Sequence, residues 1–139
     1  MKNRYFLDTS YTIALTIEKD QFHKRAVDLS FKLSETNSEI ITTQAILLEI
    51  GNALAKKKYR LSAVNILQQL ESDTRTAIVG LTPELHDRAF ELFSSRMDKE
   101  WSLVDCISFV VMHERKISKA LTTDEHFIQA GFRALLRED

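Results

Sequence analysis

Short apolar runs alternate along the chain with longer segments in which apolar residues recur every three or four positions. The short runs predict buried strands at residues 5–7, 40–42, 77–79 and 120–121, with a last edge strand at 132–136. The longer segments predict helices at residues 10–17, 22–36, 43–57, 61–70, 82–97, 102–116 and 125–130. Strands that alternate with helices in this way predict an α/β layer fold with a short, mostly parallel sheet flanked by helices.

Length and composition favour a single domain over residues 1–139. The chain has 139 residues, with 44% hydrophobic and 28% charged residues, which is typical of a soluble globular domain. Cys106 is the only cysteine, so an intrachain disulfide and a thiolate zinc site are both excluded, and a cytoplasmic location fits. The first twenty residues lack a signal-peptide pattern, and the apolar run Trp101–Met112 is too short to span a bilayer, so we expect no membrane segment.

The charge balance limits which nucleic-acid functions are compatible with the chain. A net charge of -1 argues against a protein that coats nucleic acid non-specifically, but a nuclease with an acidic centre can carry a local basic rim. The only dense basic run is Lys56, Lys57, Lys58 and Arg60, directly after the helix expected at 43–57. This run either contacts RNA phosphates or is a solvated helix end, where positive charge suits the helix dipole.

Four acidic residues stand in unusually apolar company. Asp8 and Asp124 each follow an expected strand, whereas Glu49 and Asp105 lie within strongly apolar helical segments. A carboxylate in such surroundings is costly unless it is paired, hydrogen-bonded or bound to a metal. Each acid also has an ordinary explanation: Asp8 and Asp124 as helix caps, Glu49 as a half-exposed residue satisfied by Asn52. That explanation is weakest for Asp105.

The expected fold gives these acids a reason to meet. In a parallel sheet ligands gather at the carboxyl ends of the strands, where Asp8 and Asp124 are expected. If the helices that carry Glu49 and Asp105 line the same crevice, four carboxylates converge and repel one another unless a cation or shared protons intervene. Ligands that are all oxygen favour Mg²⁺ or Mn²⁺. The expected metal ligands are Asp8 and Asp105 directly, with Glu49 and Asp124 bound directly or through water.

Three side chains close in sequence to the expected ligands are open to more than one interpretation. Thr9 or Ser10 hydrogen-bonds a ligand carboxylate, contacts the substrate, or simply caps the first helix. His126, two residues after an expected ligand, is interpreted as a packing or helix-start residue rather than a catalyst.

The order and surroundings of the four acids resemble the PIN-domain family and, within it, the VapC-type toxins of bacterial toxin–antitoxin pairs. The resemblance covers essentially the whole chain, and each motif is weak alone but strong in this order. The matching stretches are Phe6–Ser10, Leu48–Leu54, Ser102–Ser108 and Leu121–Phe127, followed by Gly131 and Phe132.

The resemblance implies a three-layer fold and cleavage of RNA that depends on Mg²⁺ or Mn²⁺. It places the family's four acids at Asp8, Glu49, Asp105 and Asp124, and it implies products with a 5′-phosphate and a 3′-hydroxyl. It further implies a homodimer and silencing by a small antitoxin protein whose tail enters the site. We therefore predict a metal-dependent endoribonuclease that acts as a toxin.

Three other functions stay open from the sequence. One is a PIN-like module that has lost activity and acts by binding a partner, and another is a housekeeping RNA-processing nuclease. The third is a domain that transfers phosphate to an aspartate such as Asp8, although this function gives Glu49 no role. No pattern in the sequence identifies the RNA target or decides whether one or two metal ions bind.

Overall fold

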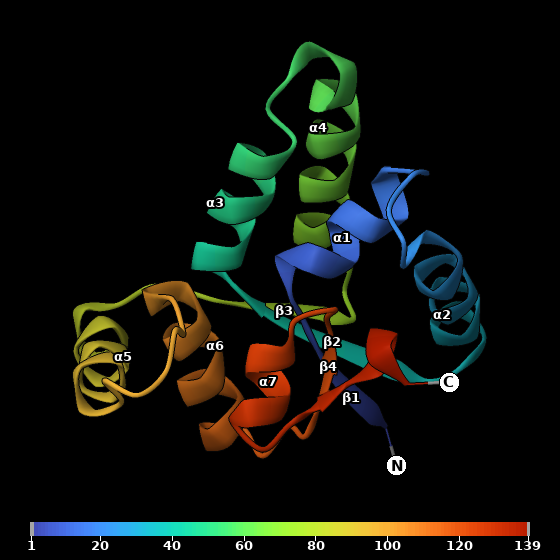
Figure 1. Ribbon diagram of the computed structural model, residues 1–139. Coiled ribbons are helices and arrows are strands. Elements are labelled where there is room, and N and C mark those ends of the chain that lie inside the picture. Colours follow the sequence, from blue (N-terminus) through green and yellow to red (C-terminus); the bar gives the residue numbers. More distant parts are fainter. Residues whose placement is uncertain (1, 139) are drawn as a thin grey trace.

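Five short strands form one parallel sheet in the computed structural model, which describes residues 2–138. The strand order is β3-β2-β1-β4-β5, and every pairing is parallel (Figure 1). The strands are β1 (Asn3–Leu7), β2 (Ser38–Thr43), β3 (Thr76–Val79), β4 (Lys119–Leu121) and β5 (Arg133–Ala134). The α/β fold with a parallel sheet flanked by helices is therefore confirmed.

The helices connect the strands in two directions across the sheet. They are α1 (Thr9–Thr16), α2 (His23–Glu35), α3 (Gln44–Ala53), α4 (Lys57–Ser72), α5 (Pro83–Ser95), α6 (Leu103–Glu114) and α7 (Glu125–Gln129). From β1 the chain moves outward through β2 to β3, then returns past β1 to β4 and β5. Because crossovers between parallel strands are right-handed, this reversal puts the helices of the two halves on opposite faces of the sheet.

Polar residues at helix starts fix most element boundaries near their expected positions. Thr43, Thr82 and Ser102 cap α3, α5 and α6, and each side-chain oxygen accepts a hydrogen bond from a backbone N–H three residues on. Pro83 then opens α5, where its missing N–H costs nothing. These caps satisfy N–H groups that would otherwise lack partners.

The start of the first helix and the extent of the last strand differ from the expected ones. Asp8, and not Thr9 or Ser10, is the residue that caps α1. The last strand covers only Arg133–Ala134, and the chain then turns into a 3₁₀ helix over Leu135–Arg137. This turn brings apolar side chains of the segment into the core, so burial rather than strand pairing decides its conformation.

The boundary between α3 and α4 also differs. The helix expected at 43–57 ends at Ala53, because Leu54 leaves the helical conformation and is fully buried. The next helix begins at Lys57, earlier than expected. The basic run therefore lies at the start of α4, where positive charge is unfavourable for the helix dipole. Its interpretation as a favourable helix end is wrong.

Aromatic side chains fill the core beneath α6 and α7. Phe127 is fully buried, and its ring packs edge-on against Phe109 with centroids 5.0 Å apart and against Phe6 at 6.3 Å. Trp101 packs on the other side of Phe109 at 5.1 Å, and its Nε1 donates to Gln129 Oε1. This cluster fixes α6 and α7 on the sheet. In the described part of the chain, no helix has the length and apolar character to cross a membrane.

Replacing Phe127 by Ala tests this cluster. Because Phe127→Ala empties a fully buried site, we expect it to lower the free energy of unfolding by about 3–5 kcal/mol in urea denaturation. The matched control is Ile128→Ala on the same helix, where the side chain is 50% exposed and the expected loss is below about 1 kcal/mol. Equal losses in the two variants would contradict the packing described.

Candidate metal centre

The candidate site lies where the strand order reverses. β1 and β4 are neighbours in the sheet, and the chain leaves them toward opposite halves of the molecule. In open parallel sheets a crevice forms outside the carboxyl ends of such a strand pair. Asp8 directly follows β1, and Asp124 follows the end of β4 after two threonines. The fold therefore puts these two acids on either side of one crevice.

Asp8 is the most deeply buried of the four acids, with 7% of its surface exposed. Its Oδ2 accepts hydrogen bonds from Ser10 Oγ at 2.7 Å and from Thr122 Oγ1 at 2.8 Å. Burial raises the pKa of Asp8 from 3.8 to about 6, against the effect of these hydrogen bonds, and the charge of Asp105 adds to the rise. An ionised Asp8 is thus costly unless a cation compensates it.

Asp105 and Asp124 meet across the imidazole of His126. Its Nδ1 lies 3.0 Å from Asp105 Oδ2 and 3.4 Å from Asp124 Oδ1. Asp124 is also the N-cap of α7, because its Oδ1 accepts the backbone N–H of His126 at 2.8 Å. Asp105 belongs to a capping box with Ser102, in which each side chain accepts the backbone N–H of the other. Both acids thus have fixed orientations.

Glu49 reaches the same site from α3. Its Oε1 accepts a hydrogen bond from Thr9 Oγ1 at 2.8 Å, and no bond from Asn52 to this carboxylate is present among the described residues. Burial raises the pKa of Glu49, and the charges of Asp105 and Asp124 raise it further. Glu49 lines the same cavity as Asp105 and Asp124.

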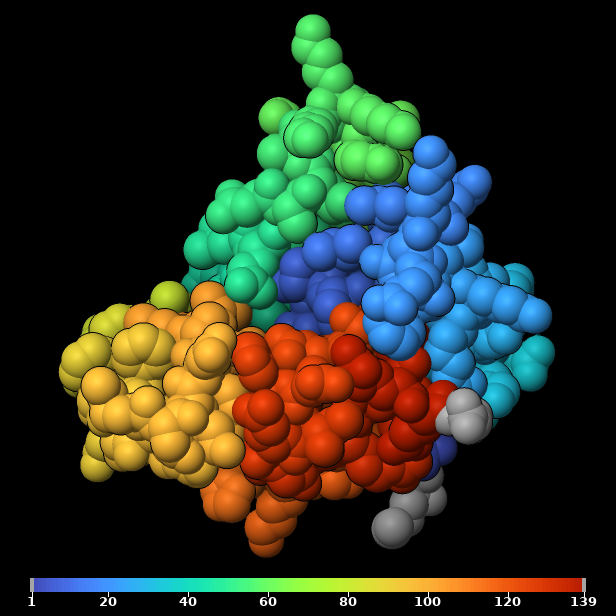
Figure 2. Space-filling model, in the orientation of Figure 1, coloured from blue at the N-terminus to red at the C-terminus, as the bar shows by residue number. Residues whose placement is uncertain are grey.

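One open cavity of about 670 Å³ is lined by all four acids. In Figure 2 the dark-blue start of α1 forms the floor of a recess between α3 in green and the α6–α7 region in orange and red. Glu100, Ser102 and His126 line the same cavity. The structure thus brings together the four residues that the sequence singled out.

Each of the four carboxylates is anchored through only one of its oxygens. The second oxygens are Asp8 Oδ1, Glu49 Oε2, Asp105 Oδ1 and Asp124 Oδ2, and within residues 2–138 none of them accepts a hydrogen bond. Ligand atoms of Asp105, Asp124 and His126 all lie within 4.8 Å of one another, whereas Asp8 and Glu49 line the same cavity without belonging to this compact group. Preoriented carboxylates with free oxygens fit a hard divalent cation.

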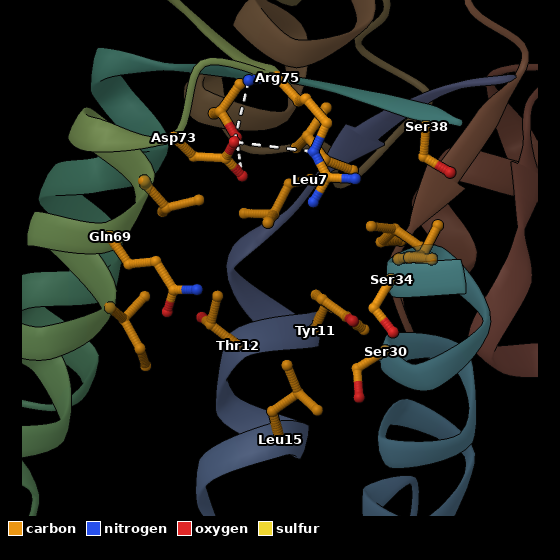
Figure 3. Close-up of a pocket in the computed structure, with 16 residues that line it drawn as sticks. Leu7, Tyr11, Thr12, Leu15, Ser30, Ser34, Ser38, Gln69, Asp73 and Arg75 are labelled. Atoms are coloured by element: carbon orange, nitrogen blue, oxygen red, sulfur yellow. Dashed lines mark hydrogen bonds and ion pairs between the residues drawn. The ribbon is translucent and has the colours of Figure 1, made fainter. Parts of the chain in front are cut away.

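A second cavity, of about 270 Å³, lies between α1, α2, α4 and the sheet. Figure 3 shows apolar side chains such as Leu7 and Leu15 around it, with serines of α2 at one side. Its only acid among the described residues is Asp73, which accepts the backbone N–H of Arg75 at 2.9 Å and pairs with its guanidinium at 3.8 Å. This cavity lacks the free carboxylates of the first one.

Sequence reasoning missed His126 and Thr122 as parts of the site. Thr122 Oγ1 accepts the backbone N–H of Asp124 at 3.0 Å and donates to Asp8, so it couples two of the acids. A residue two positions after a helix N-cap lies beside the capping carboxylate, and this spacing could have pointed to His126. Of the two alternatives for Thr9 and Ser10, hydrogen bonding to a site carboxylate is confirmed for both.

Comparisons with known proteins agree with this fold. The PIN domain family profile matches residues 5–133. The 23S rRNA-specific endonuclease VapC20 from two strains of Mycobacterium tuberculosis is 28% identical over 127 residues, which are 91% of this chain and 94% of the relative. The crystal structure of Mycobacterium tuberculosis VapC20, described as a sarcin-ricin loop cleaving toxin, superposes with a TM-score of 0.82 at 27% identity and covers 94% of this chain and 97% of that one. The chain therefore belongs to the PIN domain family and is similar to its VapC-type toxins.

Proposed function

We propose that the chain is a metal-dependent endoribonuclease and the toxin of a toxin–antitoxin pair, with Asp8, Glu49, Asp105 and Asp124 as its catalytic carboxylates. The observation that carries this proposal is the set of four anchored carboxylates, each with one free oxygen, in a single open cavity. The convergence of four carboxylates on one cavity of a PIN domain supports a catalytic role.

The cation in this proposal is Mg²⁺ or Mn²⁺. Asp8 and Asp105 would hold it directly, and Glu49 and Asp124 would complete its surroundings directly or through water. Carboxylate oxygens suit both ions. A bound divalent cation lowers the pKa of the attacking water and neutralises charge on the phosphate.

The chain's own residues orient the reaction. Ser10 and Thr122 hold the carboxylate of Asp8, and Thr9 holds that of Glu49, so the ligand oxygens need no rearrangement during the reaction. Water adds to the phosphorus of the RNA backbone, and the bond from phosphorus to O3′ breaks. The products then carry a 5′-phosphate and a 3′-hydroxyl.

The proposed substrate and partners follow from the similarity to VapC20. A relative described as a 23S rRNA-specific endonuclease and toxin supports an RNA substrate, a small antitoxin protein as inhibitor and action in the cytoplasm. We extend the proposal to a homodimer, which is common in the family, and to a single functional domain over residues 1–139. The continuous sheet and single apolar core of the described residues support the latter.

The alternative functions have less support. A binding module without activity has no use for four converging carboxylates, which destabilise the empty fold through mutual repulsion. Phosphate transfer to Asp8 gives no role to Glu49, whose carboxylate lines the same cavity. A housekeeping nuclease would use the same site and differs only in the RNA that it cuts.

Asp105→Asn tests the catalytic role. We expect this variant to cleave RNA at least about 100-fold more slowly than the wild type in Mg²⁺ or Mn²⁺. The cation's stabilisation of charge at the phosphate is worth several kcal/mol, and a neutral side chain at position 105 weakens it. The fold should survive, because the amide oxygen of Asn still accepts the backbone N–H of Ser102. The measurement is cleavage of labelled RNA, with circular dichroism to verify folding.

The matched control is Asp28→Asn, an exposed acid on α2, which should keep full activity. Excess EDTA should abolish cleavage by the wild type. Full activity of Asp105→Asn, or equal wild-type activity in EDTA, would falsify the proposed mechanism.

The raised pKa of Asp8 predicts a pH-dependent stability of the metal-free protein. Between pH 3.8 and about 6 the folded state keeps a proton that the unfolded state has lost, so stability falls as the pH rises through this window. Asp8→Asn removes this fall. Its stability advantage over the wild type should grow from near zero below the window to about 1–3 kcal/mol above it.

Urea denaturation in EDTA at a series of pH values measures this difference, with Asp28→Asn again as the control. If the difference between Asp8→Asn and the wild type stays constant across the pH range, Asp8 does not titrate as described.

A further inference from the structure

The connection between α3 and α4 carries a concentrated positive charge. In Figure 1 these two helices project from the sheet as a pair, and in Figure 2 their connection forms the green point at the top of the molecule. Five exposed cationic side chains belong to this connection and to the nearby turn after α1, and together we call them the basic tip: Lys19, Lys56, Lys57, Lys58 and Arg60.

The basic tip lacks acidic partners. Among residues 2–138, none of its side chains lies within 4 Å of a carboxylate oxygen, although Glu18 is a sequence neighbour. Several cations elsewhere are paired, as when Arg88 and Arg133 contact glutamates at 2.8 and 2.7 Å. In a chain with a net charge of -1, this is a local excess of unneutralised positive charge.

Helix stability does not explain these charges. Lys57, Lys58 and Arg60 lie in the first turn of α4, where the helix dipole is positive and cations are unfavourable. Arg60 has one structural contact, because its Nε donates to the carbonyl of Ala55 at 2.8 Å. The lysines have no such bond among the described residues. A polyanionic ligand would offset this repulsion.

The basic tip is close to the acidic cavity along α3. Asn52 and Ala53, at the end of this helix, line the cavity together with Glu49. α3 rises about 1.5 Å per residue from Glu49 to its last residue, Ala53, so it carries the chain about 6 Å toward the connection that holds Lys56. Lys19 and Lys58 line a common hollow of about 390 Å³ with Tyr59 and Glu18.

We propose that the basic tip binds the phosphate backbone of the RNA strand that leaves the acidic cavity. The inference rests on the proposed nuclease function, since it identifies the surface that holds the substrate of that site. Four carboxylates repel an RNA strand, and the basic tip supplies the attraction that brings the strand to them. Because the contacts are to phosphates, they provide affinity rather than sequence preference.

The test compares RNA binding by charge variants in EDTA, where no cleavage occurs. The tip variant combines Lys56→Gln, Lys57→Gln and Lys58→Gln. The control variant combines Lys2→Gln, Lys32→Gln and Arg115→Gln, which are exposed positions outside the basic tip, and changes the net charge equally. The probe is a fluorescein-labelled, mixed-sequence single-stranded RNA of about twelve nucleotides, a length within the range of single-strand sites. Its binding is measured by fluorescence anisotropy at several salt concentrations.

We expect the tip variant to bind at least tenfold more weakly at low salt. The slope of log affinity against log salt should fall in magnitude by about two, since each lost phosphate contact on a single strand contributes about 0.7. The control variant should stay within about twofold of the wild type. Replacing the same three lysines by Arg keeps the charge and should preserve binding, which separates loss of charge from loss of fold.

Equal affinity and salt slope in the tip and control variants would overturn the proposal, and an acidic protein would then be the better candidate partner of this surface. In Mg²⁺ or Mn²⁺ the tip variant should cleave with a raised KM and an unchanged kcat. If the wild type cleaves no RNA but binding still depends on the basic tip, the nuclease function fails and the RNA-binding surface stands.

Discussion

The hydrogen bond from Thr122 Oγ1 to Asp8 Oδ2, 2.8 Å long, joins the ends of two neighbouring strands at the point where the sheet changes direction. It partly offsets the effect of burial, which raises the pKa of Asp8. The same hydroxyl accepts the backbone N–H of Asp124, so one threonine sets the positions of acids from both halves of the fold. The geometry of the cavity depends on this junction.

Three of the four acids also have a local structural role. Asp8 and Asp124 cap helices, and Asp105 completes a capping box. The sequence made Asp105 the firmest candidate because its helix is so apolar, but its position in the first turn gives it ordinary partners. Asp8 proves to be the most desolvated acid. What distinguishes these residues is their convergence with one free oxygen each.

Much of the fold could be predicted because its signals are local. Apolar runs, helical periodicity and the pair Thr82-Pro83 locate most elements within a few residues. The end of α3 could not be predicted, because apolar periodicity continues through Leu54 while the chain already turns. The contact of His126 with Asp105 was also hidden, since 21 residues separate them. Such contacts arise only when the helices dock.

The central claim is that the four carboxylates bind a divalent cation, and titration of the purified protein with Mn²⁺ followed by electron paramagnetic resonance tests it most directly. The account predicts saturable binding that Mg²⁺ displaces and that Asp8→Asn and Asp105→Asn each weaken, while Asp28→Asn leaves it unchanged. Absence of saturable binding, or binding that is insensitive to both site variants, would contradict it.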